Sequence, residues 1–216
     1  MRPAAPDERA AGEPVSHVVL MGTGEPMDNY ENVARFLRTV HDPAGRNLSY
    51  RNVTLSTCGV IPGIERLGAE FPQVNLAISL HAATDEKRSS LMPVNDAYPL
   101  AELLKACRAH AERTGRRVTF EYTLIRGEND SAEDADRLAG LLRGMLSHVN
   151  VIPLNKVKEK EYTGATREAA RTFAERLERK GVPATVRREL GSDIDAACGQ
   201  LRRRSRNGQE QNGQEQ

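Results

Sequence analysis

Short apolar runs rich in β-branched residues alternate along this chain with segments whose apolar residues recur at helical spacing. Strands that are separated by helices form a parallel sheet with right-handed crossovers and helices outside. The spacing does not distinguish an open sheet from a closed barrel. It predicts strands at 16–21, 53–57, 74–80, 118–125, 149–154 and 184–187, and helices at 29–40, 61–71, 100–113, 132–145 and 166–180.

The first of these strands runs directly into a glycine-containing turn, SHVVLMGTGEP at 16–26. Its uninterrupted apolar residues predict a strand covered on both faces, and glycines let the backbone approach a ligand closely. Ligand sites of parallel α/β proteins lie at the carboxyl ends of strands. Glu25 is therefore placed to accept hydrogen bonds from a bound ammonium or hydroxyl group. A tight turn with a solvated glutamate explains the same residues.

Polar residues also follow the other strands. Because parallel strands end at one edge of a sheet, these residues would line a single cleft for an elongated, polar, mainly uncharged ligand. Each has a local explanation as well, such as ending a strand or capping a turn. The residues are Gly24, Glu25, Ser56, Thr57, Ser79, His81, Arg126, Asn129 and Asn155.

Local sequence patterns predict the structure of three further features. Ala83–Tyr98 reads as a loop long enough to be functional. Ser131 and Asp134 nearly match a capping box and predict a helix start. Cys107 lies on the apolar stripe of its helix, so we expect it in the core.

The charges and cysteines limit the possible partners. The three cysteines, Cys58, Cys107 and Cys198, are far apart and form no CxxC pair, which argues against disulfides or a metal site within this chain. No apolar run is long enough to span a membrane and no signal-peptide pattern is present, so we expect a cytoplasmic protein. A basic segment could contact a polyanion or could be a solvated tail; it contains Arg187, Arg188, Arg202, Arg203, Arg204 and Arg206.

Seven segments together resemble a known family. They are GTGEP at 22–26, STCGVIPGI at 56–64, LAISLHA at 76–82, LMPVN at 91–95, LIRGEND at 124–130, VIPLN at 151–155 and GSDIDAACGQL at 191–201. In this order they resemble the radical S-adenosylmethionine (SAM) RNA methyltransferases that modify carbon-2 of adenine in 23S rRNA and certain tRNAs. The match runs from about Ser16 to Leu201.

The resemblance implies a SAM pocket at the strand ends. Gly24 and Glu25 would hold the methionine ammonium, which suits a carboxylate acceptor. The other matched positions offer groups for ribose, carboxylate and adenine edges; they are Ser56, Ser79, Leu80, His81 and Asn155.

The resemblance also implies a role for Cys198 as the residue that bears a methyl group covalently. In the family, one SAM methylates this cysteine, and a radical from a second SAM removes hydrogen from that methyl group, which then adds to adenine. Small neighbours, Ala196, Ala197 and Gly199, would leave the sulfur accessible. Read alone, a cysteine beside two alanines is more typical of a core.

The sequence departs from the family in one important respect. The family binds a 4Fe-4S cluster through a CxxxCxxC loop, whose three thiolates leave one iron open for SAM; this chain has no such loop. The family's N-terminal domain, its upstream acid/base glutamate and its second reactive cysteine are also missing. We therefore expect an N-terminally truncated copy that binds no iron and methylates nothing alone.

The expected fold is then an incomplete (βα)6 radical-SAM partial barrel that lacks the first βα unit. Residues 1–15 would be a disordered linker, 16–201 the radical-SAM core with the methyl-carrier segment, and 202–216 a disordered tail with the repeat NGQEQ. An absent edge strand would leave the sheet exposed and prone to aggregation. We expect a monomer that acts on 23S rRNA and tRNA with an electron donor such as flavodoxin.

Three alternatives remain open at this point. The chain could be a SAM- or RNA-binding remnant without catalysis, or a methyltransferase for carbon-8 of adenine. It could also be an unrelated α/β-barrel lyase or hydrolase that uses Glu25 and His81 as acid and base. The last alternative predicts that replacing Cys198 by Ala leaves activity intact.

Overall fold

A parallel sheet forms the centre of the molecule. The computed structural model describes residues 15–22, 24–154 and 163–187. The strands of this part lie in the order β1-β2-β3-β4-β5-β6 and all neighbours are parallel, as the alternating pattern predicts. They are β1 (Val18–Leu20), β2 (Val53–Thr57), β3 (Asn75–Ser79), β4 (Val118–Leu124), β5 (Ser147–Pro153) and β6 (Ala184–Val186).

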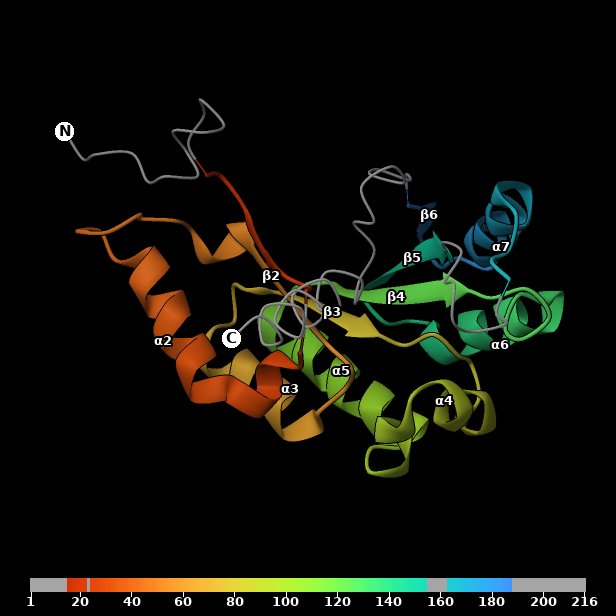
Figure 1. Cartoon of the computed structure of the whole chain (residues 1–216), viewed down its shortest axis with the longest axis horizontal. Coiled ribbons are helices and arrows are strands. Elements are labelled where there is room, and N and C mark those ends of the chain that lie inside the picture. Colours follow the sequence, from red (N-terminus) through yellow and green to blue (C-terminus); the bar gives the residue numbers. More distant parts are fainter. Residues whose placement is uncertain (1–14, 23, 155–162, 188–216) are drawn as a thin grey trace, which may run out of the picture.

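The helices gather on one side of this sheet. In Figure 1, α2, α3, α4 and α5 lie below the strands, and α6 and α7 continue this layer around the β5–β6 end. The helices are α2 (Tyr30–His41), α3 (Ile61–Glu70), α4 (Asp85–Leu91), α5 (Leu100–Thr114), α6 (Ala132–Leu142) and α7 (Arg167–Arg179); short 3-10 turns are η1 (Pro26–Asn29), η2 (Tyr50–Asn52) and η3 (Pro93–Asp96). No helix within the described ranges is both long and apolar enough to cross a membrane.

The core lies between the sheet and these helices. Strand residues alternate between two faces, and in β4 the residues Val118, Phe120, Tyr122 and Leu124 are all 0% exposed. The intervening Thr119 and Thr123 are half-buried and point to the other side, which we call the open face. Cys107 is fully buried in this core, as expected. The capping box of Ser131 and Asp134 is also confirmed at the start of α6.

The expectation that the first strand is covered on both faces is wrong. Among the strands that the structure describes, β1 pairs only with β2, and Val19 is 63% exposed while Val18 and Leu20 pack against the core. Val19 points to the face of the sheet that no described helix covers, whereas Val18 and Leu20 point to the helical layer.

The expectation of a loop at Ala83–Tyr98 is also wrong, because this segment contains α4 and η3. The Thr84 hydroxyl accepts a hydrogen bond from the Lys87 amide and caps α4. α4 spans only Asp85–Leu91 and has no apolar stripe of its own. Its buried residue is Arg88, and a helix that buries a cation cannot be recognised from hydrophobic periodicity.

Candidate functional site

Ser56, next to the last residue of β2, and Ser79, the last residue of β3, lie on the open face of neighbouring strands. Ser56 is opposite Ala77 of β3, and Ser79 lies two residues further along the same face. Both are half-buried. Within the described residues neither hydroxyl forms a hydrogen bond, so both remain available to a ligand. The structure thus brings these two predicted residues to one edge.

Glu25 is fixed where β1 and β2 end. Its Oε1 accepts a hydrogen bond from the Met27 amide at 3.0 Å, and its Oε2 accepts one from the Cys58 amide at 2.7 Å. Gly24 before it has φ +92°, a conformation that favours glycine. A carboxylate has about four lone-pair sites, so these two bonds orient Glu25 and still leave it acceptor capacity for an ammonium.

His81 follows β3 in a left-handed conformation, φ +58°, which is unusual for a residue with a side chain. Its Nδ1 accepts a hydrogen bond from the Thr123 amide at 3.0 Å. Burial, helped by the nearby charge of Arg88, lowers the pKa of His81 to about 4. At neutral pH the imidazole is therefore uncharged, and Nε2 bears the proton and can donate it in a hydrogen bond.

Leu80 and Asn129 have structural roles in this edge. The Leu80 side chain is fully buried and its amide donates to the Glu121 carbonyl at 3.0 Å. Asn129, also 0% exposed, donates from Nδ2 to the carbonyls of His81 and Thr123, both at 2.7 Å. Asn129 therefore does not line a cleft; it joins the end of β3 to β4.

A buried arginine supports this edge, and sequence reasoning missed it. Arg88 is 0% exposed; its Nη2 donates to the Cys58 carbonyl at 2.6 Å and its Nη1 to Asn95 Oδ1 at 2.8 Å. The Cys58 peptide is thus held by Glu25 on its N–H and by Arg88 on its carbonyl. Gly59 has φ +111°, and a Cβ there would lie 2.9 Å from Leu103, so only glycine fits next to this peptide.

Two of the three cysteines, Cys58 and Cys107, lie within the described residues. Burial, followed by the effect of Glu25, raises the pKa of Cys58 to about 12, and burial raises the pKa of Cys107 to about 12. Both thiols are therefore protonated at neutral pH in the metal-free structure. The described part of the chain holds no group of three residues that could bind a metal ion.

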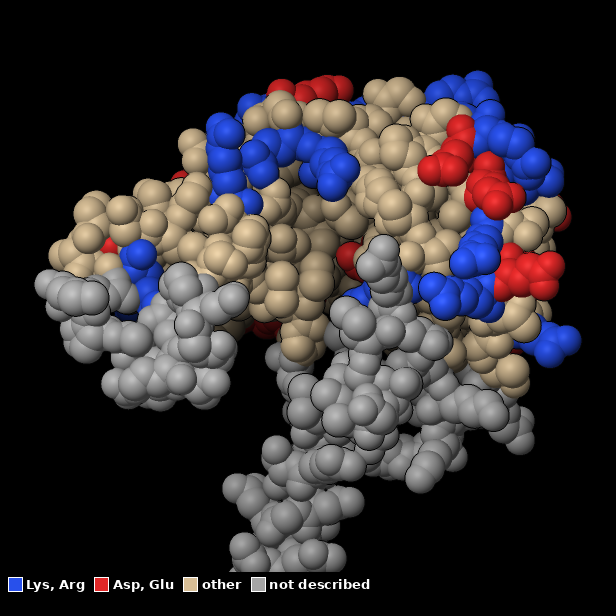
Figure 2. Space-filling view, turned by 90° about the horizontal axis from the view of Figure 1, so that it is seen from above, with Lys and Arg blue, Asp and Glu red and all other residues tan. Residues whose placement is uncertain are grey.

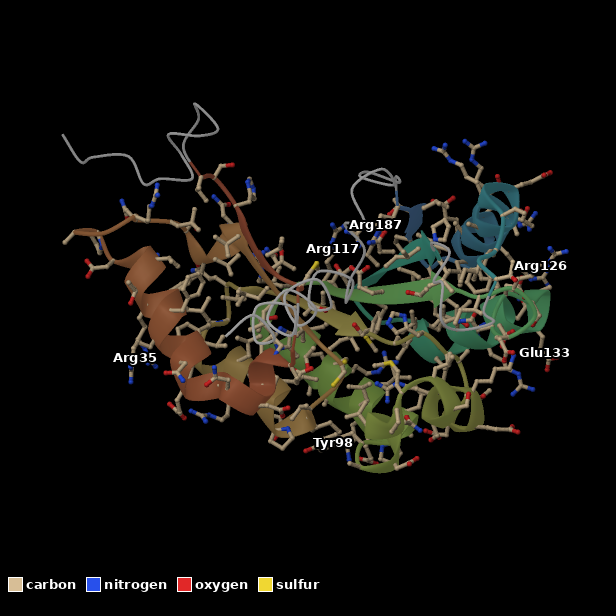
Figure 3. All side chains as sticks on the ribbon, in the orientation of Figure 1. Arg35, Tyr98, Arg117, Arg126, Glu133 and Arg187 are labelled. Carbon is tan, nitrogen blue, oxygen red and sulfur yellow. The ribbon has the colours of Figure 1, made fainter. Side chains whose placement is uncertain are left out.

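Two predicted site residues, Asn155 and Cys198, lie outside the described residues, as do Arg188 and Arg202–Arg206. Their proposed positions at the site stay predictions. Arg187 is described and exposed. In Figure 3 it lies with Arg117 on the open side above β4 and β5, whereas Arg35, Tyr98 and Glu133 lie on the helical side.

The open face is more polar than the strand ends alone suggest. From above, Figure 2 shows basic side chains gathered at the margins of a hollowed, mainly uncharged centre. Strand register places further polar residues on this face, and the polar/apolar alternation of β2, β4 and β5 is the signal that could have identified them. They are Thr54, Thr119, Glu121, Thr123, His148 and Asn150.

Sequence comparison identifies known proteins that are similar to this chain. A family model described as the radical SAM superfamily matches residues 7–139. The chain is 53% identical over 196 residues to a probable dual-specificity RNA methyltransferase RlmN from Clostridium perfringens, and 57% identical over 198 residues to one from Desulforudis audaxviator. The alignments cover 91% and 92% of this chain but only 56% and 62% of those proteins.

Structural comparison agrees with the sequence comparison. The crystal structure of a radical SAM methyltransferase from Sphaerobacter thermophilus superposes with a TM-score of 0.87 at 49% identity, covering 90% of this chain and 57% of that one. The radical SAM superfamily model, which matches residues 7–139, covers more than half of this chain. The resemblance of the strand-end motifs is thereby confirmed, and the chain belongs to the radical SAM superfamily.

Proposed function

We propose that this chain provides the SAM-binding and methyl-accepting part of an enzyme that methylates carbon-2 of adenine in 23S rRNA and tRNA. The observation that supports this most is the 53% and 57% identity to proteins named dual-specificity RNA methyltransferases, over nine-tenths of this chain. The exposed Arg117 and Arg187 beside the open face are suited to RNA phosphates, which supply affinity without sequence preference.

The residues of the edge fit SAM by their chemistry. Glu25 would accept hydrogen bonds from the methionine ammonium, and His81 would donate from Nε2 to an acceptor such as the carboxylate. Ser56, Ser79 and Asn155 would contact ribose and adenine. SAM supplies the methyl group when bound, and Cys198 would be the residue of this chain that receives it.

A 4Fe-4S cluster does not fit the described residues, and the sequence has no CxxxCxxC loop. We infer that the 216-residue chain alone assembles no cluster and methylates no RNA. The sheet would correspond to a partial barrel from the family's second strand onward, since GTGEP at 22–26 matches the turn after that strand. A cytoplasmic, monomeric state and partnership with a flavodoxin-like donor belong to the same proposal.

Equilibrium dialysis of the chain with radiolabelled SAM tests the cofactor site. Saturable binding that Glu25→Gln weakens, with Glu133→Gln unchanged as the control on the helical side, supports the proposal. Absence of saturable binding, or equal binding by both variants, contradicts it. In the same preparation, anaerobic incubation with iron and sulfide should produce no cluster absorption band; a band would refute the inference that these 216 residues assemble no cluster.

A second candidate is a SAM- or RNA-binding module without catalysis, which would use the same strand-end residues to bind but would transfer no methyl group. Mass analysis of Cys198 in the complete, full-length enzyme purified from cells separates the two. A methylated cysteine identifies a methyl carrier, and an unmodified one in all preparations favours the binding module. Methylation at carbon-8 instead of carbon-2 would be detected by analysing RNA nucleosides after reaction with the complete enzyme.

A further inference from the structure

Helix α4 carries two neighbouring cations that contact different parts of the molecule. Lys87 Nζ forms an ion pair with Asp134 Oδ1 at 2.6 Å, which joins α4 to α6. Arg88 donates instead to the Cys58 carbonyl, which directly follows β2 at the candidate cofactor edge. Within the described ranges Arg88 forms no ion pair. The two residues therefore allow the packing of α4 to be compared with an effect on this edge.

Burial of the Arg88 guanidinium is unfavourable by itself. The residue is 0% exposed, its Nε has no hydrogen-bond partner among the described residues, and burial lowers the pKa of Arg88. Its Nη1 donates to Asn95 Oδ1, and Asn95 Nδ2 donates to Asp85 Oδ1 at 2.9 Å, so a neutral amide lies between the cation and this carboxylate. Hydrogen bonds to neutral acceptors offset the desolvation of a buried cation only in part. The guanidinium fixes the positions of its two acceptors, one of which is the Cys58 carbonyl.

The turn formed by Cys58 and Gly59 links this cation to Glu25. Gly59 has φ +111°, and a Cβ there would lie 3.2 Å from Arg88 Nη2, so the backbone approaches the guanidinium closely. The Cys58 carbonyl accepts from Arg88, while the Cys58 amide donates to Glu25 Oε2 at 2.7 Å. A change in the position of this turn would therefore move the donor that orients the Glu25 carboxylate.

The charge of Arg88 also acts on the residue that follows the neighbouring strand β3. Together with burial, it lowers the pKa of His81. An uncharged imidazole keeps Nδ1 as an acceptor for the Thr123 amide and Nε2 as a donor for a ligand. One buried cation thus acts at the ends of both β2 and β3.

We propose that Arg88 is a positioning residue for SAM. It holds the turn of Cys58 and Gly59, and through this turn it orients the Glu25 carboxylate that would accept the methionine ammonium. The inference rests on the proposed function, because it takes SAM as the ligand of this edge. Arg88 is fully buried and would not contact SAM itself.

Equilibrium dialysis of the full chain with radiolabelled SAM tests this role with a matched pair of α4 variants. Arg88→Met should weaken SAM binding about tenfold, because a hydrogen bond to a charged group depends on the orientation of that group. Lys87→Met breaks the neighbouring ion pair, so it should also lower the free energy of unfolding but keep the wild-type SAM affinity. Affinities are compared under conditions where circular dichroism shows that each variant is folded.

A third variant and an NMR titration distinguish positioning from a general loss of structure. Arg88→Lys keeps the charge but not the planar group that reaches both acceptors, so its SAM affinity should lie between those of the wild type and Arg88→Met. The imidazole proton signals of His81 should report a raised pKa in Arg88→Met and the wild-type pKa in Arg88→Lys and Lys87→Met. A loss of stability alone would not produce this pattern.

The outcomes distinguish this inference from the function on which it rests. If the wild type binds SAM but Arg88→Met and Lys87→Met bind it equally well, or if the His81 titration is the same in the wild type and Arg88→Met, the inference is wrong and the proposed function stands. If Arg88→Met does not fold, a weaker SAM affinity of Arg88→Lys than of Lys87→Met supports the inference, and equal affinities contradict it. If the wild-type chain binds no SAM, both are wrong.

Discussion

The two faces of the sheet use the same strands for different purposes. On the helical side β4 contributes Val118, Phe120, Tyr122 and Leu124, which are buried among α-helices. One residue away on the open side it contributes Thr119, Glu121 and Thr123, whose groups pair only partly within the described residues. Burial of apolar area stabilises the fold, whereas unpaired polar groups are available to a ligand. Because side chains alternate along a strand, the residues that stabilise the fold lie on the helical side and those available for binding lie on the open side.

Neighbouring substitutions in β4 test this separation most strongly. Phe120→Ala should destabilise the chain by about 3–5 kcal/mol, because it removes a fully buried ring and leaves a cavity. Thr119→Ala, on the open face, should change the free energy of unfolding by less than about 1 kcal/mol. Urea unfolding followed by circular dichroism measures both. Equal losses would show that the open face is packed like the core.

The sequence predicted the sheet well because alternation and helical spacing are local and repeated. It placed Glu25, Ser56, Ser79 and His81 at strand ends, and strand pairing brings them to one edge. It did not predict Arg88, because a single chain gives no sign that a lysine- and arginine-containing segment folds over a backbone carbonyl. It also missed Glu121, since the search considered strand ends and not the alternating positions within strands.

Arg88 is the exception on the helical side, since it is a buried cation without an ion pair among the described residues. Arg88→Met should destabilise the chain by about 2–4 kcal/mol, because Asn95 Oδ1 and the Cys58 carbonyl lose their donors in a buried site. Urea unfolding measures the loss. Arg137→Met, which removes an exposed pair with Glu133, is the control and should leave the unfolding midpoint unchanged.

Loss of Arg88 should also weaken the hydrogen bond between the Cys58 amide and Glu25, because Arg88 and Glu25 hold the same peptide from the two sides of the sheet. The Cys58 amide, which donates to Glu25, should shift upfield in the proton NMR spectrum of Arg88→Met. Arg88→Lys keeps the charge but not the planar two-nitrogen geometry, so it should restore part of the stability. A Cys58 amide that does not respond to either substitution would mean that the Glu25 contact is independent of the helical side.

Lowering the pH should reduce the free energy of unfolding through protonation of His81. The folded pKa of about 4 lies below the ordinary value of 6.5, so the unfolded chain binds the proton first and stability falls as pH drops from 6.5 towards 4. Above 6.5 the effect is absent. The contribution reaches about 3 kcal/mol. His81→Asn, which tolerates the left-handed backbone, removes it, so the variant should lose less stability than the wild type in urea unfolding near pH 4. Parallel pH curves for the two proteins would mean that the imidazole accepts protons freely in the folded state, and the uncharged Nε2 donor assigned to the site would be wrong.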